Sequence, residues 1–154
     1  MSLRSIILCC SFLWLSSALS AQLVIGDDGL YYNEDESLYT GTYIEFYGNG
    51  NKKIEVNIEN GKKEGVTVLY FENGTKSEIR SYKEGLMDGT WVMWNEDTVK
   101  IGVANYRNDL KDGEWMVWDE HGTLRFVMHY TEGERSGIWK MYDEKGDLIT
   151  EMEY

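Results

Sequence analysis

The sequence contains no proline and only two cysteines, Cys9 and Cys10, among its 154 residues. Without proline, the turns have to be made by residues such as glycine and asparagine, and the chain holds 16 glycines. Both cysteines lie in an apolar run near the N-terminus. A mature chain without this run could form no disulfide, and it would offer no thiolate as a nucleophile or metal ligand.

Basic residues are also scarce. The chain has 15 lysines and arginines but 27 aspartates and glutamates, which gives a net charge of -12. This charge repels nucleic-acid phosphate and the surface of an anionic bilayer, so it argues against both as partners. It favours solubility and is compatible with a basic or cationic partner.

The first 21 residues are typical of a cleaved secretory signal peptide. They begin with the positive charge of Arg4, continue as an apolar run from Ile6 to Leu15, and end in small residues. Cleavage after Ser20 and cleavage after Ala21 both fit this pattern. A membrane anchor is the alternative, but the apolar run is shorter than the roughly 20 residues that span a bilayer. We therefore expect an exported protein, periplasmic, cell-surface or secreted, without an integral membrane span after cleavage.

A six-residue pattern of glycine followed by aromatic and apolar residues recurs every 24 residues, most clearly in Gly89–Trp94 and Gly113–Trp118. A fixed period of this length indicates a repeat protein, in which each unit buries its apolar surface against its neighbours. The glycines that mark the period, called marker glycines below, are Gly41, Gly65, Gly89, Gly113 and Gly137.

Each repeat unit has the sequence pattern of a β-hairpin. About six residues rich in aromatic and β-branched side chains follow the marker glycine, and then come a turn, a second strand and another turn. The segments are short, glycine interrupts them, and they lack the apolar stripe of a helix. We predict an all-β fold: a single antiparallel sheet of about five 24-residue β-hairpin repeats over residues 41–154, with a short N-terminal cap or degenerate repeat over residues 22–40.

The alternation of apolar residues is not in phase throughout the chain. Relative to the marker glycines, one set of alternating apolar residues lies one residue out of phase with another: Ile54, Val56 and Ile58 against Val99, Ile101 and Val103. A β-bulge in some units would explain this difference, and so would unequal burial of the two faces of the sheet. The sequence leaves both explanations open.

The pattern Gly-x-Trp-x-x-Trp/Tyr, a glycine turn and Tyr-x-x-Gly resembles the MORN repeat, in the shorter variant that also occurs in YwqK-type antitoxin-like proteins. The resemblance covers residues 38–154. It implies a solenoid of β-hairpins with interaction roles rather than a reaction, and it calls for no cofactor. The residues that carry it most clearly are Gly89, Trp91, Trp94, Tyr106, Gly113, Trp115, Trp118, Gly122, Tyr130, Gly133, Gly137, Trp139, Tyr142 and Gly146.

Aromatic residues recur two and five positions after the marker glycines. Residues three apart in a regular strand point to opposite faces, so these side chains should form two ladders, of which one could be the more exposed. A packing role is favoured, because aromatic cross-strand pairs stabilise sheets by about 0.2–1 kcal/mol each. An exposed ladder would instead bind a peptide, a glycan or a partner protein. The candidate binding residues are Trp91, Trp94, Trp115, Trp118, Trp139 and Tyr142.

We find no pattern that would support catalysis or metal binding. Catalysis by carboxylates needs two environments with different pKa values, whereas the glutamates seven positions after the marker glycines have four similar ones and fit turns better. His121 and His129 have no third ligand at a suitable spacing, so we predict no metal site. The glutamates are Glu72, Glu96, Glu120 and Glu144.

We therefore expect a non-enzymatic protein-interaction module with an unidentified protein partner. The alternative is a module that binds cell-wall or surface glycan through the aromatic ladder, and an enzyme with a site in the N-terminal cap is the least favoured. The last strand, Leu148–Tyr154, should be an open edge, with Glu151 and Glu153 as charges that discourage pairing. A further hypothesis is that this edge, or the aromatic face next to it, takes a partner by strand addition or self-association.

Overall fold

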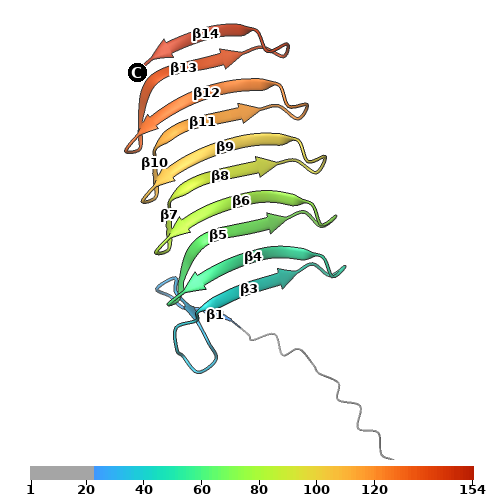
Figure 1. Ribbon diagram of the computed structural model, residues 1–154, viewed down its shortest axis with the longest axis vertical. Helices are drawn as coiled ribbons and strands as arrows, with labels where there is room; N and C mark the ends of the chain where they lie inside the picture. Colours follow the sequence, from blue (N-terminus) through green and yellow to red (C-terminus); the bar gives the residue numbers. More distant parts are fainter. Residues whose placement is uncertain (1–22) are drawn as a thin grey trace, which may run out of the picture.

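The computed structural model describes residues 23–154, which form strands and turns without any helix in that range. Five long hairpins lie side by side from the N-terminal cap to the C-terminus (Figure 1). The signal peptide predicted over residues 1–21, with its cleavage after Ser20 or Ala21, lies outside the described residues. The hairpins are β3 (Gly41–Phe46) with β4 (Lys52–Glu59), β5 (Lys62–Tyr70) with β6 (Lys76–Lys83), β8 (Gly89–Trp94) with β9 (Lys100–Arg107), β11 (Gly113–Trp118) with β12 (Leu124–Thr131), and β13 (Glu134–Tyr142) with β14 (Leu148–Glu153).

The hairpins form one antiparallel sheet in the order β14-β13-β12-β11-β9-β8-β6-β5-β4-β3. Two short strands, β7 (Leu86–Met87) and β10 (Leu110–Lys111), extend the pairing of β6 and β9. The turns within hairpins lie in a column along one edge of the view in Figure 1, and the turns between hairpins lie in a column along the other. The predicted fold, a single antiparallel sheet of hairpin repeats, is confirmed.

The N-terminal segment forms a separate two-stranded sheet of β1 (Val24–Ile25) and β2 (Tyr31–Tyr32). It is attached to the first turn between hairpins. The N–H of Tyr31 donates to the carbonyl oxygen of Gly61 at 2.9 Å, and the N–H of Gly61 donates to that of Tyr39 at 2.8 Å. The segment therefore covers the first hairpin at the β4–β5 turn.

The marker glycines are needed for their backbone conformation. All five have positive φ, from 60° at Gly137 to 153° at Gly41, a range that side chains oppose. From the sequence we predicted that each marker glycine begins a strand, and for two hairpins this prediction is wrong. β5 begins at Lys62 and β13 at Glu134, so Gly65 and Gly137 lie inside strands, where the pairing with the preceding strand shifts register.

A β-bulge occurs at the same place in every hairpin. In the third hairpin, for example, Met93 pairs with Gly102 but the next residue, Trp94, pairs with Lys100. Because all five hairpins share this shift, it does not explain the phase difference of the apolar residues. Val56 and Val103 lie on opposite faces, and only Val56 is buried, at 2% exposure. The two faces are thus unequally buried at these positions, and the bulge also interrupts the alternation within the third hairpin, where Ile101 is the extra residue.

Few side chains are buried, because within residues 23–154 only the N-terminal segment at the β4–β5 turn covers part of the sheet, and no second layer covers the rest. The buried apolar residues are Val56, Ile58, Tyr82 and Ala104, and Thr67 is buried with them. These residues all lie on one face of the sheet, which is called the ladder face below. The residues two and four positions after each marker glycine lie on the same face, and so do their cross-strand partners. With so thin a core, each hairpin depends on its neighbours for stability.

Polar side chains join consecutive hairpins across the opposite face. At the position 16 residues after the marker glycine, four hairpins have a side chain that donates or can donate to a carbonyl oxygen of the next hairpin. The last hairpin has Glu153 there, whose carboxylate has no proton to donate. The four pairs are Asn57 with Val66, Ser81 with Thr90, Asn105 with Glu114, and His129 with Ile138.

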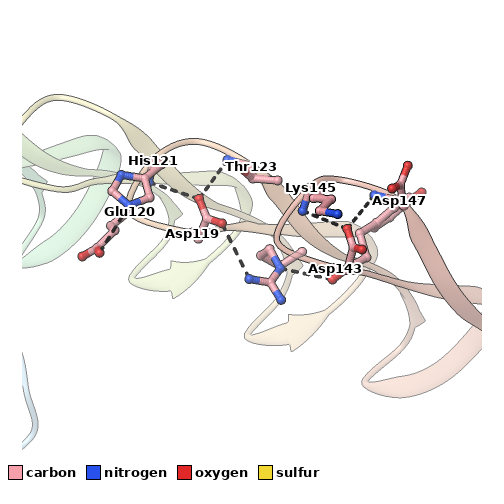
Figure 2. A network of polar contacts seen from close by, with 9 residues as sticks. Asp119, Glu120, His121, Thr123, Asp143, Lys145 and Asp147 are labelled. Carbon is pink, nitrogen blue, oxygen red and sulfur yellow. Dashed lines mark hydrogen bonds and ion pairs between the residues drawn. The ribbon is translucent and has the colours of Figure 1, made fainter.

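The turns within the hairpins use their carboxylates for structure (Figure 2). Asp119 Oδ1 accepts hydrogen bonds from the N–H groups of His121 and Thr123, at 3.1 and 2.9 Å. Asp143 Oδ1 repeats this arrangement in the next turn. Arg125 links the two turns, because its Nη1 lies 3.6 Å from Asp119 Oδ2 and its Nε donates to the carbonyl oxygen of Tyr142.

Candidate functional site: an aromatic ladder with cations

A continuous row of seven aromatic rings runs along the ladder face from β6 to the C-terminus. Tyrosine and tryptophan alternate, and neighbouring ring centroids are 4.9–5.9 Å apart with inclined planes. This is the favoured geometry of aromatic pairs, which contribute about 0.5–1.5 kcal/mol each beyond their burial. The rings, called the ladder below, are Tyr82, Trp91, Tyr106, Trp115, Tyr130, Trp139 and Tyr154.

The ladder tryptophans also complete the backbone hydrogen bonding between hairpins. Adjacent hairpins diverge near the marker glycine, so that β9 and β11 pair directly only around Met116 and Val117. In the divergent region each indole Nε1 donates to a carbonyl oxygen of the preceding hairpin, at 2.9–3.3 Å. Phenylalanine could not do this, because it has no N–H group. The pairs are Trp91 with Ser81, Trp115 with Asn105, and Trp139 with His129.

The six aromatic residues predicted from the sequence are divided between the two faces. Trp91, Trp115 and Trp139 belong to the ladder. The other three lie on the opposite face, where Trp94 pairs with Lys100, Trp118 with Leu124, and Tyr142 with Leu148. All six are half-buried, so neither set is the fully exposed one. Their role in binding stays a prediction.

The sequence reasoning did not include the ladder tyrosines among the candidate binding residues. The structure shows that they are half of the ladder. Their signal was present, because Tyr82, Tyr106, Tyr130 and Tyr154 recur with the same 24-residue period, 17 positions after the marker glycine.

Sequence reasoning also missed four cations that lie over the ladder rings. Lys63 Nζ is 4.9 Å from the ring centroid of Tyr82, and Arg80 Cζ is 4.9 Å from that of Trp91. These are cation–π contacts. Two further cations contact two rings each: Lys111 Nζ lies 4.5 Å from Trp115 and 4.7 Å from Tyr130, and Arg135 Cζ lies 4.7 Å from Trp139 and 5.2 Å from Tyr154. We call the four residues the ladder cations.

Most of the ladder cations have no acidic partner. Arg80 pairs with Glu78 at 2.6 Å. Within residues 23–154, however, no carboxylate lies within 4.0 Å of the charged groups of Lys63, Lys111 or Arg135. Burial lowers the pKa of the Lys63 ammonium group, and the charge of Arg80 lowers it further. In a chain of net charge -12, the ladder face therefore concentrates unpaired positive charge.

An open groove of about 440 Å³ lies over the first three hairpins, toward the turns within them, and no ladder ring lines it. Its apolar lining includes Ile54, Leu69 and Met93, and the predicted binding residue Trp94 lines it too. The groove widens the contact surface that the ladder face could offer to a partner.

No cluster of three or more histidine, cysteine, aspartate or glutamate side chains in residues 23–154 is arranged to hold a metal ion. The same part of the chain includes no helix that is long and apolar enough to span a membrane.

The geometry defines the protein as a β-hairpin repeat protein with a single exposed sheet. Residues 39–60, 63–84, 111–132 and 135–154 match the family model described as MORN repeat variant. These matches cover more than half of the chain, which therefore belongs to this family. MORN repeats are generally non-catalytic interaction modules. The comparison with curated proteins found no match.

The family model passes over residues 85–110, although β8 and β9 form the same hairpin as the other units. Two turn positions in this hairpin depart from the repeat. Thr98 and Asp109 have φ of 63° and 67°, whereas glycine occupies the equivalent positions of the other turns with positive φ. The main chain keeps the repeat geometry where the side chains depart from the pattern.

Proposed function

We propose that the protein is an exported, non-enzymatic interaction module whose ladder face binds a protein partner. The observation that carries this proposal is the continuous ladder with its unpaired cations, on a face that the described chain covers only at its Lys63 end, where the N-terminal segment lies. Half-buried tryptophan, tyrosine and arginine side chains are the residue types that dominate binding energy at protein interfaces.

The positions of the ladder cations favour a protein partner over a neutral glycan. Sugars stack on the open face of an aromatic ring. Here Arg80 lies over Trp91, Lys111 over Trp115, and Arg135 over Trp139, so each ladder tryptophan already has a cation on it. The glycan hypothesis therefore requires the cations to move away or to contact the sugar themselves.

The antitoxin-like role suggested by the YwqK resemblance is a special case of this proposal, in which the partner is a toxin. Export would place that toxin outside the cytoplasm as well. Determining the N-terminus of the mature protein tests export, with Ala21 or Gln22 expected as the first residue.

Face-selective photo-crosslinking tests the proposed function. A photoreactive residue replaces Met128, which pairs with Trp115 on the ladder face, or Val127, which pairs with Met116 on the opposite face. We expect one defined protein to be cross-linked from position 128 and not from position 127. Equal cross-linking from both positions, or none from 128, would contradict the proposal.

A further inference from the structure

We infer that the ladder face receives an extended acidic peptide in the polyproline II conformation, with carboxylates three residues apart that meet Lys111 and Arg135 of successive units. This inference rests on the proposed function and names the chemistry of the partner at the same site.

Three of the four ladder cations are unpaired. The chain has nearly twice as many acidic as basic residues, yet Lys63, Lys111 and Arg135 have no carboxylate partner within 4.0 Å among the described residues. Unpaired cations that are held in place by rings are complementary to carboxylates of a partner.

Two of the ladder cations follow the period of the sheet. Lys111 and Arg135 occupy the same repeat position in successive units and therefore lie about two strands, or about 9.6 Å, apart. The ladder has the same period, because ring centroids between Tyr106 and Trp139 are 5.1–5.3 Å apart and two such steps separate successive tryptophans.

Two extended peptide conformations can be compared with this period. In a β-strand, side chains on the same side recur every two residues, or about 6.6 Å. In polyproline II they recur every three residues, or about 9.3 Å. Only the second spacing matches one hairpin, so acidic side chains three residues apart would meet Lys111 and Arg135 in turn, whereas the same repeat position of the third unit is Met87.

The ladder face suits a ligand whose backbone stays solvated. A β-strand ligand needs the unpaired N–H and C=O groups of a sheet edge, whereas the ladder face offers rings and cations. A polyproline II backbone has no such need, because it remains solvated, and it docks on aromatic-lined grooves.

The net charge of the protein limits the shape of the ligand. Exposed glutamates such as Glu120 and Glu144 lie in the turns at one border of the sheet, where a wide polyanion would meet them. A single acidic chain along the ladder stays within reach of the cations, and at physiological salt charges beyond about 8 Å are largely screened. A narrow peptide therefore fits, and an anionic membrane surface does not.

The test is a titration of the protein with a peptide of four Glu-Pro-Ala repeats, followed by calorimetry. Two control peptides have Gln in place of Glu, or the same composition with the four Glu residues contiguous. We expect the periodic acidic peptide to bind at least about tenfold more tightly than either control, the effect of charge-assisted contacts in register. Equal affinity for the three peptides would overturn the inference.

Protein variants locate the site. We expect Lys111→Gln with Arg135→Gln to weaken binding of the periodic peptide about tenfold. Lys100→Gln is the matched control, because Lys100 Nζ lies 4.4 Å from the Trp118 ring on the opposite face, and it should leave binding unchanged. A loss with Lys100→Gln equal to that of the double variant would also overturn the inference. Circular dichroism of each variant verifies that the sheet is retained.

Failure of this inference and failure of the proposed function give different results. If the periodic peptide does not bind while position 128 still cross-links a defined protein, the acidic peptide is wrong and the interaction face stands. If position 128 cross-links nothing, the proposed function fails. Tighter binding of oligogalacturonate than of the periodic peptide would replace the peptide by an acidic glycan.

Discussion

The indole N–H of Trp115 donates a hydrogen bond of 2.9 Å to the carbonyl oxygen of Asn105, in the preceding hairpin. The same carbonyl also accepts a bond from the N–H of Asp112 at 3.0 Å. The tryptophan therefore holds two repeat units together in the region where their strands diverge, and it does so in addition to its stacking on Tyr106 and Tyr130.

This role predicts that Trp115→Phe lowers the free energy of unfolding more than Trp118→Phe. Both changes remove part of a half-buried indole, but no hydrogen bond from the Trp118 indole is present in the described chain. The difference should be about 1 kcal/mol, the contribution of one hydrogen bond. Chemical denaturation of the two variants measures it, and equal losses would contradict the role of the indole N–H.

We predict that a substitution at Thr98 stabilises the protein, because the backbone there is strained. Its φ of 63° is unfavourable for a β-branched residue, and glycine occupies the equivalent position of the other four hairpins. Thr98→Gly should raise the free energy of unfolding by about 1 kcal/mol. Gly50→Thr is the reverse change at a site with φ of 87° and no atom within 4 Å of an added Cβ, so it should lower stability through backbone strain alone. Thermal unfolding that shows no gain for Thr98→Gly would exclude strain in this turn.

We predict that a substitution in the edge strand β14 increases self-association. Glu153 occupies the position at which Asn57 and Asn105 donate to the next hairpin. Glu153→Asn would restore the donor and remove one charge, so the dimer fraction in sedimentation should rise. Glu144→Gln makes the same change of charge in an exposed turn and should leave association unchanged. If both variants associate equally, charge rather than the missing donor controls the edge.

We predict that the contribution of Asp119 to stability depends on pH. Hydrogen bonds from the N–H of Thr123, and also from that of His121, together with the charge of Arg125, lower the pKa of this carboxyl below its usual range. Its contribution is therefore fully present above the unfolded pKa and is lost as the pH falls through the folded one. Asp119→Asn should be less stable than the parent chain at pH 7, and the difference should vanish at strongly acidic pH. Urea unfolding at several pH values measures this, and a difference that does not depend on pH would contradict it.

Much of the fold could be predicted from the sequence, because its determinants are local. Gly89 and Gly113 mark positions of positive φ, and the residues between successive glycines have the composition of strands. The separation of Trp91 and Trp94 onto opposite faces also followed from their spacing. The extent of the strands did not, because Gly65 and Gly137 are accommodated inside strands by bulges that leave no separate signal.

The candidate site was predicted only in part. The ladder tryptophans were found, but their tyrosine partners and the ladder cations were not. Tyr106 contacts Trp115 from the neighbouring hairpin, and Lys111 reaches both Trp115 and Tyr130. Such diagonal contacts depend on register and twist, which a periodic pattern does not specify.

By itself, the sequence determined a row of similar hairpins, because glycine spacing and residue type act on each turn and strand locally. Only the tertiary structure decided which face collects the unpaired cations, because that depends on how neighbouring hairpins are offset when they pair. The position of Lys63, Lys111 and Arg135 over one line of rings results from this offset.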